Sequence, residues 1–243
     1  MTEAATAGPA DVLAVIGPPD TAVPVAETAA VIARLTGGDV RELRLAAGLS
    51  PEHAAGRVLR ALDRPGTACG VLAGGEPSRA VWSRVARQAA KPVVLVPDGL
   101  SGQPPRLRRV LLPLDGTPQS AAAVAAVAER FALGGAELVV LHVFGPDTVP
   151  MFWDQHAHAG QAWTREFLAR YCAVPGARLE LRVGIAAEHV VQVAGAEDAD
   201  VITLAWSQRL EPGRAPVVRR ALQDAEVPVM LIPVAPARRD HGP

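Results

Sequence analysis

The sequence comprises 243 residues, of which 49% are hydrophobic and 20% are charged, and its formal net charge is −1. This length can bury the core of one large domain or two small ones, and the near-neutral charge gives no bulk field that would recruit nucleic acid or an anionic membrane surface. The chain has no apolar run of the ~18 residues that a membrane span requires, and its first residues lack the basic and apolar segments of a secretory signal.

The first half of the chain alternates short apolar strands with helical stretches, which is typical of an α/β protein with a parallel sheet. A strand is predicted at 11–17 and, after a first helix, a second strand that contains ELRL at 42–45. This half ends on the apolar strand PVVLVP at 92–97. The stretch DGLSGQPPRLRR at 98–109, rich in Gly and Pro, then indicates a linker.

The second half contains five predicted strands alternating with helices, which makes a complete doubly wound unit. The strands are predicted at 109–114, 136–143, 177–183, 199–206 and 227–233. Helices are predicted after the first strand, around Trp163, Phe167 and Tyr171, and at 186–196 and 216–224.

Three segments of the first half recur in the second. PVVLVP at 92–97 and GLSPEH at 48–53 recur 136 residues later as PVMLIP and GIAAEH, whereas DVLAVIG at 11–17 recurs 98 residues later as RVLLPLD. The difference of 38 residues places a deletion between the first helix and residue 48. We therefore predict that the first copy has lost one strand and one helix and keeps four strands to the second copy's five.

Three stretches of the second copy carry a resemblance to a known family: RVLLPLDGTPQSAAAV at 109–124, LHV at 141–143 and VVRRALQDAEVPVMLIPV at 217–234. They resemble the universal stress protein family, over 109–235 directly and over 11–97 more weakly through the repeat. The resemblance implies two tandem, doubly wound, Rossmann-like α/β domains of the adenine nucleotide alpha hydrolase type, with strand order 3-2-1-4-5. Members of the family are often dimeric, and many bind ATP.

The repeat and the resemblance together divide the chain into four parts. We expect a shortened and degenerate N-terminal copy at 1–98, a linker at 99–108, a complete C-terminal copy at 109–235 and a disordered tail at 236–243.

In ATP-binding members of the family, an Asp at the end of the first strand and backbone of the second strand hold the adenosine. The matching residues here are Asp115 and Val143. A loop after the fourth strand, patterned G-x-x-G, nine residues and G-[ST], wraps the phosphates. Glycine is needed there because backbone N–H groups can crowd around phosphate oxygens only where no Cβ intervenes.

The corresponding loop of this sequence reads TLAWSQRLEPGRAPVVRRAL. Ala205 and Gln208 stand at the first two glycine positions, and Ala215-Pro216 stand where G-[ST] is expected. Pro216 has no N–H, so one donor of an anion site at the helix N-terminus is missing. Trp206 is expected to place its indole at the mouth of the cleft. The sequence thus predicts that the phosphate cradle has been lost.

The N-terminal copy offers no replacement for it. Its first strand ends on Gly17-Pro18-Pro19 with no acid in the place of Asp115, and Gly74-Gly75 are followed by almost no loop. We therefore expect no bound cofactor, with ATP or AMP as the alternative.

A residual nucleotide cleft could still be formed by Asp115, Val143, Trp206, Arg209 and Arg214. Asp115 has two interpretations: it recognises a ribose or an adenine, or its carboxylate caps the following helix. Arg209 and Arg214 either hold an anion through their side chains or are solvated loop residues.

No catalytic or metal-binding group is expected. His156 and His158 are spaced i, i+2 on a loop or helix, so their rings do not converge on a metal, and no third ligand is near. His53 and His189 are repeat-equivalent positions, so their pairing reflects duplication, and His142 in a strand is expected to be structural.

The two cysteines complete this expectation. Cys69 and Cys172 lie in predicted regular elements without a flanking basic cluster, which fits neither a disulfide framework nor an activated thiol. No G-x-S-x-G nucleophile elbow is present. We therefore predict a cytoplasmic protein that is not an enzyme.

Both final strands are apolar at four consecutive positions, Val93–Val96 and Val229–Ile232, and either of them left open would invite aggregation. We predict that they pair antiparallel within one chain, and that protein partners or self-association, including a homodimer, use such edges; no nucleic acid partner and no membrane insertion are expected.

Three functions follow from these expectations. The preferred one is a tandem universal stress protein without ATP binding that acts in the stress response through protein contacts. The alternatives are a nucleotide-binding member that uses Asp115 and Arg side chains, and a small-molecule sensor that regulates a transporter.

Overall fold

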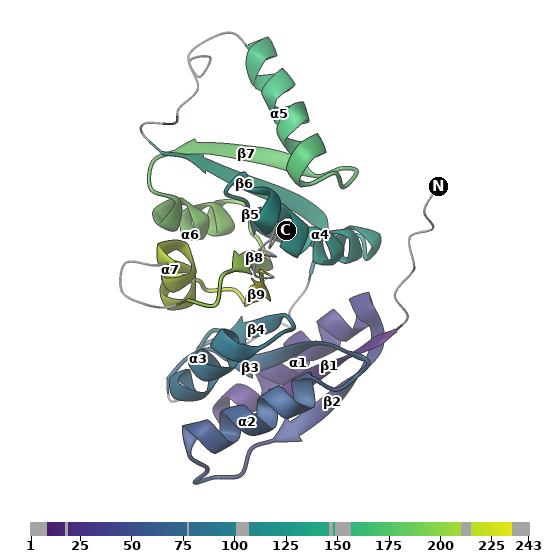
Figure 1. The fold of residues 1–243 in the computed structure, drawn as a ribbon, viewed down its shortest axis with the longest axis vertical. Coiled ribbons are helices and arrows are strands. Elements are labelled where there is room, and N and C mark those ends of the chain that lie inside the picture. The colour runs from purple at the N-terminus through teal and green to yellow at the C-terminus, as the bar shows by residue number, and fades with distance from the viewer. Residues whose placement is uncertain are drawn as a thin grey trace, which may run out of the picture.

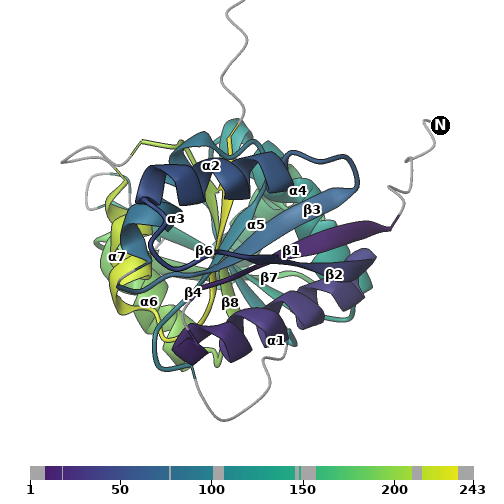
Figure 2. The same cartoon turned by 90° about the horizontal axis from the view of Figure 1, so that it is seen from below.

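The computed structural model describes residues 9–17, 19–76, 78–100, 107–145, 148, 157–209 and 215–234. They form one nine-stranded sheet in the order β2-β1-β3-β4-β9-β8-β5-β6-β7, with helices on both faces (Figures 1 and 2). Two buried clusters fill the space between sheet and helices. One of them lies under α1, α4 and α5, and the other lies under α2, α3, α6 and α7.

The N-terminal copy contains four strands, all parallel to one another, as the deletion predicts. Its elements are β1 (Ala10–Ile16), α1 (Pro19–Thr36), β2 (Gly37–Arg44), α2 (Pro51–Leu62), β3 (Thr67–Ala73), α3 (Arg79–Gln88) and β4 (Val93–Val96).

The C-terminal copy contains five parallel strands in the order β7-β6-β5-β8-β9, which is the 3-2-1-4-5 order that the resemblance implies. Its elements are β5 (Arg109–Pro113), α4 (Pro118–Leu133), β6 (Glu137–Phe144), α5 (Ala157–Tyr171), β7 (Arg178–Val183), α6 (Ala186–Ala196), β8 (Val201–Trp206), α7 (Pro216–Asp224) and β9 (Val229–Pro233).

Helix starts in the two copies follow a common local chemistry. Thr117 caps α4 and Ser50 caps α2, each accepting a hydrogen bond through its side chain, and a proline stands at the first helical position after each cap. Gly37 with φ +67° lets α1 pass directly into β2. At the next residue, Gly38, a Cβ would lie 2.3 Å from the Ala10 carbonyl oxygen, so the close approach of β2 to β1 requires glycine.

The deletion places β2 in a position that its sequence does not indicate. Its ELRL motif resembles that of β7, the outermost strand of the C-terminal copy, yet β2 pairs directly with β1, where the C-terminal copy has β6. None of the residues of β2 is fully buried, as in β7, whereas β6 has five buried residues. The deletion therefore removed an inner strand and a helix, and the edge strand moved inward by one place.

The two copies join through β4 and β9, which pair antiparallel as predicted (Figure 1). Val94 pairs with Met230, its own equivalent 136 residues later. The residue before Val94 pairs with the equivalent of the residue after it, and the residue after Val94 pairs with the equivalent of the residue before it. This register is that of a twofold axis passing between Val94 and Met230. The chain is thus an internal pseudo-dimer with one continuous sheet. Among the residues that the structure describes, no helix is both long and apolar enough to cross a bilayer.

Candidate functional site

Asp115 lies directly after β5, in the turn that leads into α4. Its Oδ1 accepts hydrogen bonds from the Thr117 backbone N–H at 3.0 Å, from the Thr117 hydroxyl at 2.8 Å and from the Ser120 hydroxyl. Thr117 is the N-cap of α4, because its hydroxyl oxygen accepts from the Ser120 backbone N–H. Asp115 therefore supports the cap rather than forming it, and no hydrogen bond from a described residue reaches its Oδ2.

The charge of Asp115 follows from these contacts. Partial burial raises the pKa of its carboxyl, but hydrogen bonds from Ser120 and Thr117 outweigh burial and hold the pKa below its usual value. Asp115 is therefore ionised at neutral pH. A ribose hydroxyl would find an acceptor here, whereas a phosphate group would meet a like charge.

A cleft of about 440 Å³ opens beside Asp115 at the carboxyl ends of the C-terminal copy's strands, where ligands bind in open α/β sheets. Asp115, Val143 and Trp206 all line it, so the structure brings together three of the five residues expected there. Arg209 is exposed and is not among the described residues that line the cleft. Arg214 lies outside the described residues.

The loop after β8 retains two glycine-like backbone conformations without glycine. Gln208 has φ +63° and Ala215 has φ +50°, both in the left-handed region that favours glycine. These are two of the three loop positions at which the family pattern has glycine. Pro216 is the first residue of α7 and offers no N–H. At both positions the backbone thus adopts a conformation that favours glycine, although both residues carry side chains and a proline follows the second.

The family model described as the universal stress protein family matches residues 106–233. The chain belongs to this family. A universal stress protein from Archaeoglobus fulgidus DSM 4304 shares the fold with a TM-score of 0.65 at 12% identity, with 94% of this chain and 97% of that chain covered. A structure from Pseudomonas aeruginosa UCBPP-PA14, whose description names the same family, gives a TM-score of 0.65 at 16% identity, with 94% of each chain covered. A comparison with curated proteins finds no match.

In this universal stress protein, two residues at and just after the end of β8 reach across the junction between the copies. The indole of Trp206 is buried, and its Nε1 donates to the Ala86 carbonyl oxygen of α3 at 2.8 Å. The Gln208 side-chain amide donates to the Ala89 carbonyl oxygen at 2.7 Å. Trp206 therefore lines the cleft, but its indole is buried rather than standing at the mouth, and its Nε1 serves the contact between the copies. A contact over 120 residues of separation leaves no local signal in the sequence.

The N-terminal copy has a cleft of its own, of about 640 Å³, at the same edge of its sheet. The strand end that corresponds to Asp115 is Gly17, and most of the described lining residues are apolar, including Val15, Leu45, Leu72 and Trp82. This cleft has the same place in its copy as the cleft beside Asp115, without an acid at the end of its first strand.

A group of aromatic side chains, which the sequence indicated only in part, packs around His142. The His142 Nδ1 lies 2.9 Å from the Leu114 carbonyl oxygen, and the ring contacts Phe144, Trp163 and Phe167. These contacts agree with the structural role expected for His142. The four-residue spacing on α5 indicated two of the aromatic residues, but not that a strand histidine would lie among them.

The remaining candidate residues are the two cysteines and the histidines outside the cleft beside Asp115. Burial raises the pKa of the Cys69 thiol to about 12 and that of Cys172 above its usual value, so neither forms a thiolate at neutral pH. The repeat-equivalent histidines differ in their contacts: His53 bonds to Ser50, its helix cap, and His189 to the Val183 carbonyl. Within the described ranges, no three His, Cys, Asp or Glu side chains gather into a metal site; His156 lies outside those ranges.

Proposed function

We propose that this tandem universal stress protein does not bind ATP in its C-terminal copy and acts as a non-enzymatic stress-response regulator through protein contacts. The observation that carries the proposal is the loop after β8. Side chains stand at Gln208 and Ala215, where phosphate-binding loops need bare backbone, and α7 opens on Pro216.

The start of α7 beside the cleft supports the same conclusion. Pro216 lines the cleft at the first position of α7 and has no N–H, so one backbone donor that a phosphate group would use is missing. Both thiols are buried and their pKa values are raised, so neither supplies a thiolate nucleophile at neutral pH, which supports the non-enzymatic part of the proposal.

Isothermal titration with Mg-ATP tests the proposal. We expect no dissociation constant below about 10 μM, which corresponds to roughly −7 kcal/mol. A universal stress protein with an intact glycine loop serves as the positive control. Tighter binding by this chain, abolished by Asp115→Asn, would overturn the proposal.

A second candidate function rests on the Oδ2 atom of Asp115, which no hydrogen bond from the described residues occupies, and on the cleft beside it. A ligand with a flat ring and hydroxyl groups, such as adenosine, fits an apolar wall and a carboxylate acceptor. Thermal-shift measurements with adenosine, AMP and ATP would then show stabilisation in that order. Stabilisation by ATP above adenosine contradicts this candidate.

A further inference from the structure

The twofold relation between the copies assigns an equivalent to each residue at their junction. The ends of α3 and α7 are 136 positions apart: Ala89 and Ala225 are their C-caps, and each donates its N–H to the carbonyl four residues earlier. The ends of β3 and β8 are 132 positions apart, because Leu72 pairs with Leu95 as Leu204 pairs with Leu231.

On one side of the axis, the end of α3 is covered by the chain itself. The carbonyls of the last helical turn have no partner within a helix. The Trp206 indole and the Gln208 amide supply donors to two of them, Ala86 and Ala89. A flat ring and two N–H donors thus fill this side of the junction.

On the other side, the equivalent donors are missing. The equivalent of Trp206 is Gly74, which has no side chain. The equivalent of Gln208 is Glu76, whose carboxylate accepts hydrogen bonds rather than donating them. The carbonyls that correspond to those of Ala86 and Ala89 belong to Leu222 and Ala225, at the end of α7. Both of these residues line a cleft of about 680 Å³, a volume typical of small-molecule sites.

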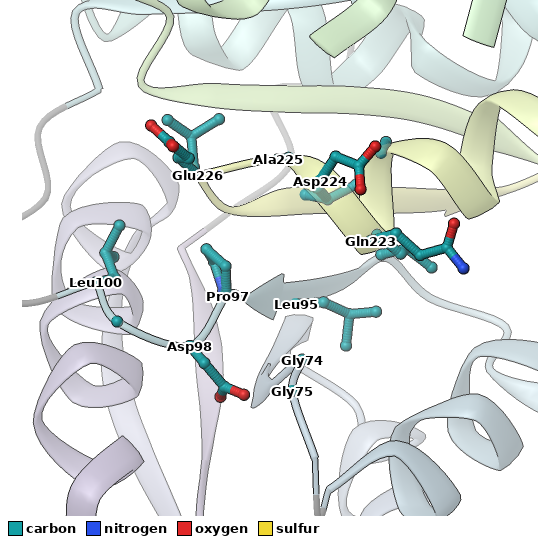
Figure 3. Close-up of a pocket in the computed structure, with 15 residues that line it drawn as sticks. Gly74, Gly75, Leu95, Pro97, Asp98, Leu100, Gln223, Asp224, Ala225 and Glu226 are labelled. Carbon is teal, nitrogen blue, oxygen red and sulfur yellow. The ribbon is translucent and has the colours of Figure 1, made fainter. Parts of the chain in front are cut away.

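The open cleft lies between the two copies. Figure 3 shows Gly74, Gly75 and Asp98 of the N-terminal copy on one side and the end of α7 on the other. A Cβ at Gly75 would lie 1.7 Å from Asp98 Oδ2, so the carboxylate covers this glycine closely.

The charge of the cleft is of one sign. Its charged described lining residues are Asp98, Asp224 and Glu226, and no Lys, Arg or His is among them. Asp224 pairs with Arg220 outside the cleft. Asp98 and Glu226 are exposed and take part in no ion pair among the described residues.

We propose that this cleft binds a small cationic aromatic compound, an aryl or indole ring that carries a protonated amine. The ring takes the place that the Trp206 indole occupies on the other side of the axis. N–H groups of the ligand meet the carbonyls of Leu222 and Ala225, and the ammonium lies near Asp98 and Glu226. The cleft shares no lining residue with the cleft beside Asp115, so this inference is independent of the proposed function.

Isothermal titration of the full chain with tryptamine tests the proposal, with indole and indole-3-propionate as neutral and anionic probes. We expect tryptamine to bind about tenfold or more tightly than either. Asp98→Asn combined with Glu226→Gln is expected to weaken tryptamine binding about tenfold. Glu129→Gln, an exposed acid on α4 outside the cleft, is expected to leave it unchanged.

Three results would overturn the proposal. They are no tryptamine binding up to about 5 mM, equal binding of the anionic probe, and unchanged tryptamine affinity in the double variant. Both substitutions are on exposed residues, and an unchanged melting temperature of the unliganded variant establishes that it folds.

Discussion

The two copies of this protein differ most where they are farthest from each other. At the junction itself, both copies contribute their last strand, and β4 and β9 pair in a register that a true dimer of identical domains would have. At the outer end the N-terminal copy lacks an inner strand and a helix, and β2 lies where the C-terminal copy has β6. A parallel sheet tolerates such a loss at its outer end, because the remaining crossover still joins two adjacent parallel strands.

The clefts at the strand ends also differ between the two copies. The C-terminal cleft retains Asp115, which Thr117 and Ser120 orient, whereas the larger N-terminal cleft has Gly17 in its place and is mostly apolar. The two clefts therefore share a place in the fold and differ in the charge at the end of the first strand.

The largest effect is expected from a charge in the shared strands. Val94 and Met230 are 0% and 3% exposed and pair with each other, so Val94→Asp and Met230→Asp each bury a charge that has no partner. We expect each to cost more than about 4 kcal/mol, enough to separate or unfold the copies. Melting temperature and hydrodynamic radius are the measurements.

Leu133, an apolar residue that is 87% exposed at the end of α4, provides the control, and Leu133→Asp is expected to cost about 1 kcal/mol or less, mainly because a negative charge is unfavourable at a helix C-terminus. If both junction variants keep the melting temperature and radius of the natural chain, the pairing of β4 with β9 is wrong.

A smaller effect is expected from substituting two buried tryptophans, because the indole N–H of one donates a hydrogen bond to a described residue and that of the other does not. Trp206→Phe removes the indole donor to Ala86, whereas Trp82→Phe removes an indole N–H that is buried and has no hydrogen-bond partner among the described residues. Both variants lose similar volume, so we expect Trp206→Phe to cost about 1–2 kcal/mol more than Trp82→Phe. Urea denaturation of the two variants measures the difference; equal costs would mean that the bond across the junction adds no stability.

The smallest effect concerns an ionic cluster that the two copies do not share. At the start of the C-terminal strands, Arg178 bonds to Glu137 and Glu197, and Arg109 bonds to Glu137. Hydrogen bonds from Arg178 hold the pKa of both glutamates below the usual 4.5. In the N-terminal copy, Asp11 stands where Arg109 does and pairs only with Arg41 among the described residues.

Because the folded-state pKa values of Glu137 and Glu197 are lowered, their contribution is fully present above pH 4.5 and is lost as the pH falls through the folded-state values. Since Glu137 and Arg178 are 39% and 40% exposed, solvent screens the pair, and we expect Glu137→Gln to cost less than about 1 kcal/mol at pH 7. The cost should shrink as the pH falls below 4.5, as urea denaturation at a series of pH values can show. A cost independent of pH would assign the effect to packing, and Glu129→Gln is the control.

The sequence predicted the features that repeat or alternate. The jump in repeat offset identified the missing strand, and two apolar final strands identified the junction, because apolar edges have to be paired. It did not predict the place of β2, since strand position depends on which neighbours remain. It also did not predict where the Nε1 of Trp206 points, because nothing near Trp206 in the chain marks a carbonyl 120 residues earlier.

The exchange of Trp206 for Gly74 across the axis has a consequence for how such a protein can change over time. In a dimer of identical subunits, one substitution alters both symmetric sites at once, so one site cannot be filled while its twin stays open. Joining the copies in one chain removes that constraint, because each site is encoded separately. Here one side is closed by the protein's own indole and the other remains a cleft of about 680 Å³. Every molecule therefore carries one site that its own indole fills and one site that is open.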